Sequence, residues 1–146
     1  MQPKRHALAN QKGGVGKTAT TLGLASAISH RGGRALIVDM DPQANATEGL
    51  GIYTEDGQLT TADLMDRTEA GSAIDAVVAT DWAGVDLIPS HLDLSNAESS
   101  GASDLVFRLD VAFEGLDLSP YDAVLFDCPP SLGKLLFAVL LTVDTV

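Results

Sequence analysis

The sequence is short of basic residues, cysteine and long hydrophobic runs. Lysine and arginine together number 9 against 20 aspartate and glutamate residues, which gives a formal net charge of −11. A surface of this sign repels the phosphates of nucleic acids. Either the chain does not bind DNA, or the DNA-binding surface lies outside these residues. The longest apolar stretch, residues 135–141, is far shorter than the roughly 20 residues that cross a bilayer, so no membrane partner is expected.

Only one cysteine, Cys128, is present. One thiol cannot form an internal disulfide, and no second cysteine is available to complete a metal or cluster site. This usage fits a reducing, cytoplasmic compartment, and the N-terminus does not have the pattern of a signal peptide. Hydrophobic residues make up 45% of the 146 residues, which is enough for a single domain over residues 1–146 with its own core.

The first forty residues alternate between strand and helix patterns. We expect a strand over residues 6–10, a glycine-rich turn over 13–16, a helix over about 17–30 and a buried strand over 34–39. Apolar residues spaced three and four apart indicate the helix, and a pair of glycines ends it. Strand, turn, helix and strand in this order form a βαβ unit, which predicts a parallel sheet.

The remainder of the chain continues this alternation. Strands are expected over residues 85–89 and 121–127 and from 143 onward, and helices over 61–65, 72–79, 94–114 and 131–141. The strands over 34–39 and 121–127 are almost entirely apolar, as in a sheet that is covered on both faces. The predicted fold class is therefore α/β, with a mostly parallel, doubly wound sheet and flanking helices.

A glycine-rich segment, KGGVGKT at residues 12–18, lies between the first strand and the first helix. Glycines allow consecutive backbone amides to point at phosphate oxygens, and the start of a helix adds a positive end. Lys17 can supply a charge to the β- and γ-phosphates of a nucleotide, and Thr18 is placed to ligate Mg²⁺. The predicted fold is thus of the P-loop NTPase type, which binds a nucleotide together with Mg²⁺; the family resemblance described below implies that this nucleotide is ATP. The residues expected to bind the nucleotide are Gly13, Gly14, Val15, Gly16, Lys17, Thr18 and Ala19.

This segment departs from the general pattern GxxxxGK[ST], because Gln11 stands where the first glycine is expected. The variant KGGxGKT, which begins with a lysine, is matched in full. A glycine-rich turn without a ligand is the alternative interpretation. It leaves Lys12 and Lys17 beside backbone amides without a purpose.

Carboxylates follow two of the expected strands. Asp39 and Asp41 come after one strand, and Asp127 comes after another. Ligands of open α/β sheets bind at the carboxyl ends of the strands, where carboxylates can hold Mg²⁺ or orient a water molecule. An aspartate at the end of a strand is often only a turn former or a helix cap. These residues therefore indicate function mainly in combination with the glycine-rich segment.

KGGVGKT resembles the deviant Walker A motif of the ParA/MinD superfamily of ATPases. Residues 36–47, LIVDMDPQANAT, resemble its switch I region, and residues 124–133, VLFDCPPSLG, resemble its Walker B and switch II region. The resemblance covers essentially the whole chain, and the sequence DPQANAT favours the ParA/Soj branch that partitions DNA. Because members of the family are longer, the chain resembles their N-terminal portion without the C-terminal part.

The resemblance implies a role for each site residue. The first lysine of the motif would reach across a dimer to the partner's nucleotide, and the second would hold the phosphates in its own subunit. Asp41 would orient the attacking water, and Asp127 would act on Mg²⁺ mostly through water. The implied catalytic residues are Lys12, Lys17 and Asp41, and the implied magnesium residues are Thr18, Asp39 and Asp127.

The function implied is an ATP-binding, slowly hydrolysing switch in plasmid or chromosome partitioning that works as an ATP-dependent sandwich homodimer. In the family, a centromere-binding ParB-type protein triggers hydrolysis, and a basic C-terminal surface binds DNA non-specifically. Cytoplasmic and nucleoid localisation follows from that full-length behaviour. Two alternatives stay open. One is a truncated nucleotide-binding or dimerisation module with little or no ATPase activity, and the other is a ParA-like ATPase that positions a different cargo.

Overall fold

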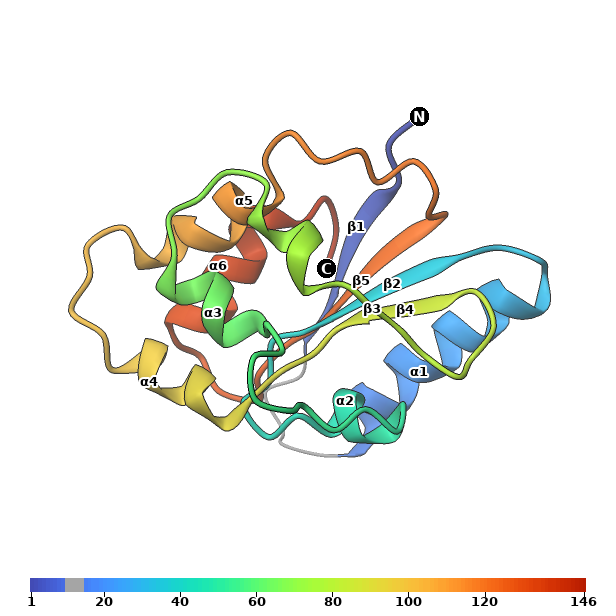
Figure 1. Ribbon diagram of the computed structural model, residues 1–146, viewed down its shortest axis with the longest axis horizontal. Coiled ribbons are helices and arrows are strands. Elements are labelled where there is room, and N and C mark those ends of the chain that lie inside the picture. The colour runs from blue at the N-terminus through green and yellow to red at the C-terminus, as the bar shows by residue number, and fades with distance from the viewer. Residues whose placement is uncertain (10–14) are drawn as a thin grey trace.

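Five strands form one sheet within the residues that the computed structural model describes, 1–9 and 15–146 (Figure 1). Their order across the sheet is β1-β5-β2-β4-β3. The strands are β1 (Lys4–Leu8), β2 (Ala35–Asp39), β3 (Val78–Ala79), β4 (Val85–Ile88) and β5 (Ala123–Asp127). Strands β1, β5, β2 and β4 are parallel, and β3 at the edge is antiparallel to β4. The mostly parallel sheet predicted from the sequence is confirmed.

The two central strands are buried along their whole length. β2 has the sequence ALIVD and β5 has the sequence AVLFD, and every residue of both strands is buried. Each of them pairs with a neighbour on both sides. The register places Asp39 of β2 beside Asp127 of β5 at their carboxyl ends. The two acidic segments of the sequence therefore meet at one edge of the sheet.

Helices cover both faces of the sheet (Figure 1). They are α1 (Val15–His30), α2 (Asn45–Gly49), α3 (Thr61–Asp66), α4 (Ser95–Glu98), α5 (Arg108–Phe113) and α6 (Lys134–Thr142). Ala35 and Ile37 of β2 belong to the core beneath α1 and α2. Leu36 and Val38 belong to the core beneath α3, α5 and α6. Because alternate residues of a strand point to opposite faces, β2 contributes to both cores, and the doubly wound arrangement is confirmed.

Local signals set the ends of the helices that lead to the site. Thr60 caps the start of α3, where its hydroxyl accepts a hydrogen bond from the Ala62 amide at 3.2 Å. The Asp63 carboxylate accepts one from the Thr60 amide at 2.8 Å in return, which completes a capping box. After α1, Gly32 adopts a left-handed conformation with φ of 78°. That conformation favours glycine and turns the chain into β2.

The prediction of one continuous helix over residues 94–114 is wrong. The structure has α4 and α5 there, with a 3₁₀ helix over Leu105–Phe107 before α5. In the segment between the two helices, the Ser99 hydroxyl donates to the Asn96 carbonyl at 3.2 Å, and the Ser100 hydroxyl accepts from the Ala102 amide at 3.2 Å. Such side-chain bonds compete with the helical pattern, and they break the helix near Gly101.

Three smaller differences concern strands. β1 starts at Lys4 and ends at Leu8 instead of running over 6–10. The helix expected over 72–79 is a 3₁₀ helix over Ser72–Ala76, followed by the short strand β3. Beyond α6, Thr145 forms a single parallel bridge with His6 of β1. A strand was expected to begin there, and the bridge shows that this segment does approach the edge of the sheet.

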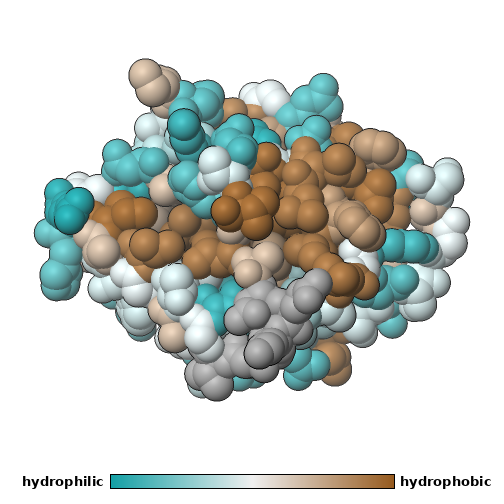
Figure 2. All heavy atoms as spheres, turned by 180° about the vertical axis from the view of Figure 1, so that it is seen from behind, coloured by the Kyte–Doolittle hydropathy of each residue, from teal (hydrophilic) through white to brown (hydrophobic). Residues whose placement is uncertain are grey.

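None of the described helices is both long enough and apolar enough to cross a membrane. Hydrophobic side chains nevertheless gather across the middle of the face opposite to that of Figure 1 (Figure 2). Among the exposed apolar side chains, Phe137 and Leu141 of α6 are 53% and 52% exposed. Because these groups stay in contact with water, they contribute little to the core.

We expect Phe126→Ala to lower the free energy of unfolding by roughly 3–5 kcal/mol, because it leaves a cavity in the core. Phe126 is fully buried on β5, and its ring centroid lies 5.5 Å from that of Phe113 on α5. The matched control is Phe137→Ala, which truncates an exposed ring and should cost less than about 1 kcal/mol. Urea denaturation followed by circular dichroism measures both. Equal losses in the two variants would contradict this account of the core.

Candidate functional site

The start of α1 lies at the carboxyl edge of the sheet, where β2 and β5 also end. α1 begins at Val15 and carries no acidic residue in its first turn, so the positive end of the helix is not neutralised locally. Gly16, Lys17 and Thr18 of the glycine-rich segment, and Ala19 after it, belong to this first part of the helix. The predicted binding residues Gly13 and Gly14, and the predicted catalytic residue Lys12, lie outside the described residues.

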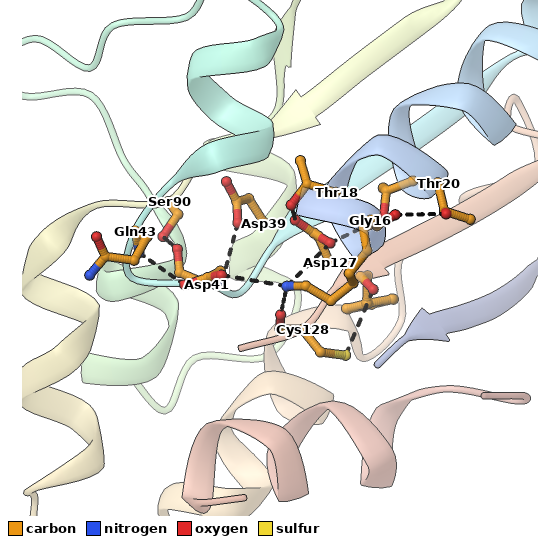
Figure 3. A network of polar contacts seen from close by, with 12 residues as sticks. Gly16, Thr18, Thr20, Asp39, Asp41, Gln43, Ser90, Asp127 and Cys128 are labelled. Carbon is orange, nitrogen blue, oxygen red and sulfur yellow. Dashed lines mark hydrogen bonds and ion pairs between the residues drawn. The ribbon is translucent and has the colours of Figure 1, made fainter. Parts of the chain in front are cut away.

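Lys17 turns its side chain into the protein between two carboxylates. These are Asp41 and Asp127, which Figure 3 labels. Lys17 Nζ lies 3.4 Å from Oδ2 of Asp41 and 3.4 Å from Oδ1 of Asp127, and it donates a hydrogen bond to the carbonyl of Cys128. The side chains of Lys17, Asp41 and Asp127 are 5%, 6% and 0% exposed. Charges this deeply buried need partners, and here one ammonium group is shared by two carboxylates.

Asp127 is held by hydroxyl groups of α1 as well as by the lysine. Thr18 Oγ1 donates to Oδ2 of Asp127 at 2.9 Å, and Thr21 Oγ1 donates to Oδ1 at 3.1 Å. Burial raises the pKa of Asp127, while the charge of Lys17 and these hydroxyl donors act in the opposite direction. Thr21 was not among the site residues predicted from the sequence. Its signal was the spacing of three residues from Thr18, which places both side chains on one face of a helix.

Asp39 lies next to this cluster and accepts three hydrogen bonds. Its Oδ1 accepts from the Asp41 amide at 3.1 Å, and its Oδ2 accepts from the amide and the hydroxyl of Thr47 at 3.0 and 2.7 Å. Burial raises the pKa of Asp39 from 3.8 to about 7, and the nearby charge of Asp127 also raises it. The hydrogen bonds from Thr47 lower that pKa. The strand register, and not a direct contact with Lys17, brings Asp39 to the site.

The loop that carries Asp41 is fastened on both sides. Asp41 Oδ1 accepts from the Gln43 amide at 3.0 Å, and the Asp41 carbonyl accepts from Ser90 Oγ at 2.6 Å. Ser90 follows β4, and its amide donates to Thr47 Oγ1 at 2.9 Å. Neither Thr47 nor Ser90 was predicted from the sequence as a site residue. No local pattern could have found Ser90, because it is separated from Asp41 by 49 positions.

A cavity of about 500 Å³ opens beside the start of α1. The described residues that line it are Ala7, Leu8, Ala9, Gly16, Lys17, Thr20 and Val146. A cavity of this size, next to a helix start and a lysine, fits a nucleotide. Among residues 1–9 and 15–146, no group of three or more His, Cys, Asp or Glu side chains could hold a metal ion by itself.

Cys128 and His91 do not add chemistry to this site. Cys128 is fully buried, and burial raises the pKa of its thiol to about 12, so it is not a thiolate nucleophile at neutral pH. The His91 ring accepts a hydrogen bond from the Asp93 amide at 3.1 Å and caps a short 3₁₀ helix. Both residues therefore have structural explanations.

Sequence comparisons match this arrangement to known proteins. A family profile described as an AAA domain matches residues 4–146. The sporulation initiation inhibitor protein Soj of Bacillus subtilis is 39% identical over 142 residues, which cover 96% of this chain and 55% of Soj. The chromosome partitioning protein ParA of Caulobacter vibrioides is 41% identical over 143 residues, which cover 96% of this chain and 53% of that protein. The chain thus spans about half the length of the curated relatives it matches.

The fold also matches solved structures. The crystal structure of cobyrinic acid a,c-diamide synthase from Mycobacterium smegmatis with bound ADP and magnesium superposes with a TM-score of 0.84 at 34% identity. The match covers 97% of this chain and 57% of that chain. The profile match over nearly the whole length, the similarity to Soj and ParA and the shared fold lead to one conclusion. This chain belongs to the AAA domain family, and it is similar to Soj and ParA over about half of their length.

Proposed function

We propose that this protein binds ATP with Mg²⁺ and hydrolyses it slowly, as a nucleotide-dependent switch in plasmid or chromosome partitioning. The observation that carries the proposal is the position of Lys17. Lys17 directly follows Gly16 in the first turn of α1, and its ammonium group lies 3.4 Å from both Asp41 and Asp127. A phosphate-binding cation and two carboxylates thus converge at one helix start. The bound ADP and magnesium of the M. smegmatis synthase support the same ligands here.

The proposed site residues divide into those that hold phosphate and those that hold Mg²⁺. The amides of Val15, Gly16, Lys17, Thr18 and Ala19 at the start of α1, together with Gly13 and Gly14, would bind the phosphates. The Thr18 hydroxyl and the Asp127 carboxylate would hold Mg²⁺, with Asp39 supporting them from the neighbouring strand. Bound Mg²⁺ supplies positive charge that neutralises phosphate oxygens.

Nucleotide phosphates and the two carboxylates compete for the same ammonium group. Lys17 satisfies its charge through Asp41, Asp127 and the Cys128 carbonyl. When phosphates engage Lys17, the Asp41 carboxylate loses this partner and becomes available to orient water. Lys17 thereby couples phosphate binding to the readiness of the proposed catalytic group.

The proposal extends to the assembly of the protein. Lys12 acts in trans in an ATP-dependent sandwich homodimer, where its charge stabilises the transferred phosphoryl group as an arginine finger does. A centromere-binding ParB-type partner stimulates turnover in the cytoplasm. Nucleoid association would require a basic surface, and the net charge of −11 argues against non-specific DNA binding through these residues. We assign partitioning rather than another cargo because of DPQANAT at residues 41–47 and the similarity to Soj and ParA.

Replacing Lys17 by alanine should abolish ATP binding at millimolar nucleotide. The change removes the phosphate-binding charge and leaves two buried carboxylates facing the ligand. Isothermal titration calorimetry with ATP and Mg²⁺ measures the loss, and circular dichroism checks that the variant is folded. Lys4→Ala is the matched control, because Lys4 is an exposed lysine on β1 and should not alter the affinity. Unchanged binding by the Lys17 variant would disprove the phosphate site.

Replacing Asp41 by alanine should preserve ATP binding while it lowers the hydrolysis rate by roughly 100-fold or more, because a group that orients water acts in the chemical step. Affinity should not fall, since Lys17 no longer has Asp41 as a competing partner. Steady-state phosphate release and calorimetry separate the two effects. Asp75→Ala, which removes an exposed carboxylate from a 3₁₀ helix, should change neither. Normal hydrolysis by the Asp41 variant would remove that residue from the mechanism.

Protonation of Asp39 should make the stability of the protein depend on pH. Its pKa in the folded protein is about 7, above its ordinary value of 3.8. The stability it contributes is therefore fully present below about pH 4 and is lost as the pH rises through 7. Between pH 5 and 8, the free energy of unfolding of the wild type should fall by about 3 kcal/mol relative to Asp39→Asn. Parallel curves for the two proteins in urea titrations across this range would show that Asp39 is not perturbed.

A further inference from the structure

We propose that Thr47 and Ser90 are positioning residues for Asp41, which they hold in place through a closed ring of buried hydrogen bonds. The inference rests on the proposed function, because it concerns the residue that we assign to the orientation of water. It identifies two hydroxyl groups from other parts of the chain, one in α2 and one after β4.

The ring can be followed bond by bond (Figure 3 shows its Asp39, Asp41 and Ser90 members). The Asp41 amide donates to Asp39 Oδ1 at 3.1 Å, and Thr47 Oγ1 donates to Asp39 Oδ2 at 2.7 Å. The Ser90 amide donates to Thr47 Oγ1 at 2.9 Å. Ser90 Oγ then donates to the Asp41 carbonyl at 2.6 Å and closes the ring.

Each hydroxyl group in the ring uses its single proton once. Thr47 Oγ1 gives its proton to Asp39 and accepts from the Ser90 amide, while Ser90 Oγ gives its proton to Asp41. Asp39, Asp41, Thr47 and Ser90 are 0%, 4%, 3% and 2% exposed. Because water has little access to these groups, a lost ring bond has no ready substitute.

The loop held by the ring has a conformation that needs support. Ala44 lies three residues after Asp41 and adopts a left-handed backbone with φ of 57°, which residues other than glycine seldom adopt. The ring binds both the amide and the carbonyl of Asp41. It therefore fixes the orientation of the two peptide groups that flank the catalytic carboxylate. A displacement of about 1 Å in such a group can lower a rate by about 100-fold.

Four variants separate positioning from general stability. Thr47→Val and Ser90→Ala remove the two hydroxyl groups, Thr47→Ser keeps the first one, and Thr142→Val removes a buried hydroxyl that donates to the Ala138 carbonyl within α6. We expect kcat to fall roughly tenfold or more in Thr47→Val and Ser90→Ala, with KM for ATP within about threefold of the wild type. Thr47→Ser should restore most of the rate, and Thr142→Val should leave it unchanged.

The double variant Thr47→Val/Ser90→Ala gives a second readout. Because both residues act through one ring, its loss of kcat should be close to that of the worse single variant rather than the product of the two losses. Hydrogen exchange gives a third readout that needs no turnover. Exchange across residues 40–47 should be faster in Thr47→Val and Ser90→Ala than in the wild type, and unchanged in Thr142→Val.

Wild-type kcat in Ser90→Ala, which is the milder of the two changes, would overturn the inference, as would a Thr47→Ser variant as slow as Thr47→Val. Loss of stability without loss of kcat would assign the ring to folding alone and would also overturn it. If the wild type did not hydrolyse ATP, or if Asp41→Ala hydrolysed it normally, the proposed function would fail instead. Unchanged exchange over residues 40–47 would then disprove the ring by itself.

Discussion

The site depends on one buried ion cluster, in which the Lys17 ammonium is placed between Asp41 and Asp127 at 3.4 Å from each. Two carboxylates shielded from water repel each other, and they are tolerated together because a cation lies between them. The cluster joins the start of α1, the loop after β2 and the end of β5. It therefore fixes how three segments that are distant in sequence meet, and it makes Lys17 the group for which phosphates must compete.

Neutral hydroxyl groups also stabilise the buried carboxylates of the site. Thr18 and Thr21 donate to Asp127, and Thr47 donates to Asp39. A hydroxyl donor satisfies a buried carboxylate oxygen without adding charge, so the local balance stays negative and suited to a divalent cation. At Asp39, burial raises the pKa and the hydrogen bonds from Thr47 lower it, and burial has the larger effect. In the ring, the Ser90 hydroxyl likewise donates a hydrogen bond, in this case to the backbone carbonyl of Asp41.

Much of the fold could be predicted because its strongest elements have strong local patterns. The apolar runs ALIVD and AVLFD became the central strands β2 and β5, and α1 ends before the glycine pair that was expected to stop it. The region around residues 94–114 was mispredicted, because serine side chains bond to the nearby backbone there and outweigh a helical spacing of apolar residues. β3 is two residues long and depends on β4 for its pairing, so it has no pattern of its own.

The chemistry of the site could be predicted from the sequence. KGGVGKT and the two aspartate segments each lie within a few consecutive residues. Phosphate and magnesium binding require particular residue types at such short spacings. The pairing of Asp39 with Asp127 and the bond between Ser90 and Thr47, 43 residues apart, were decided by the tertiary structure. Both follow from the order of strands, in which β5 lies between β1 and β2, and β4 lies on the other side of β2. Strand order depends on how whole layers pack against each other. The local periodicity of a sequence does not indicate which distant segment will become a neighbour.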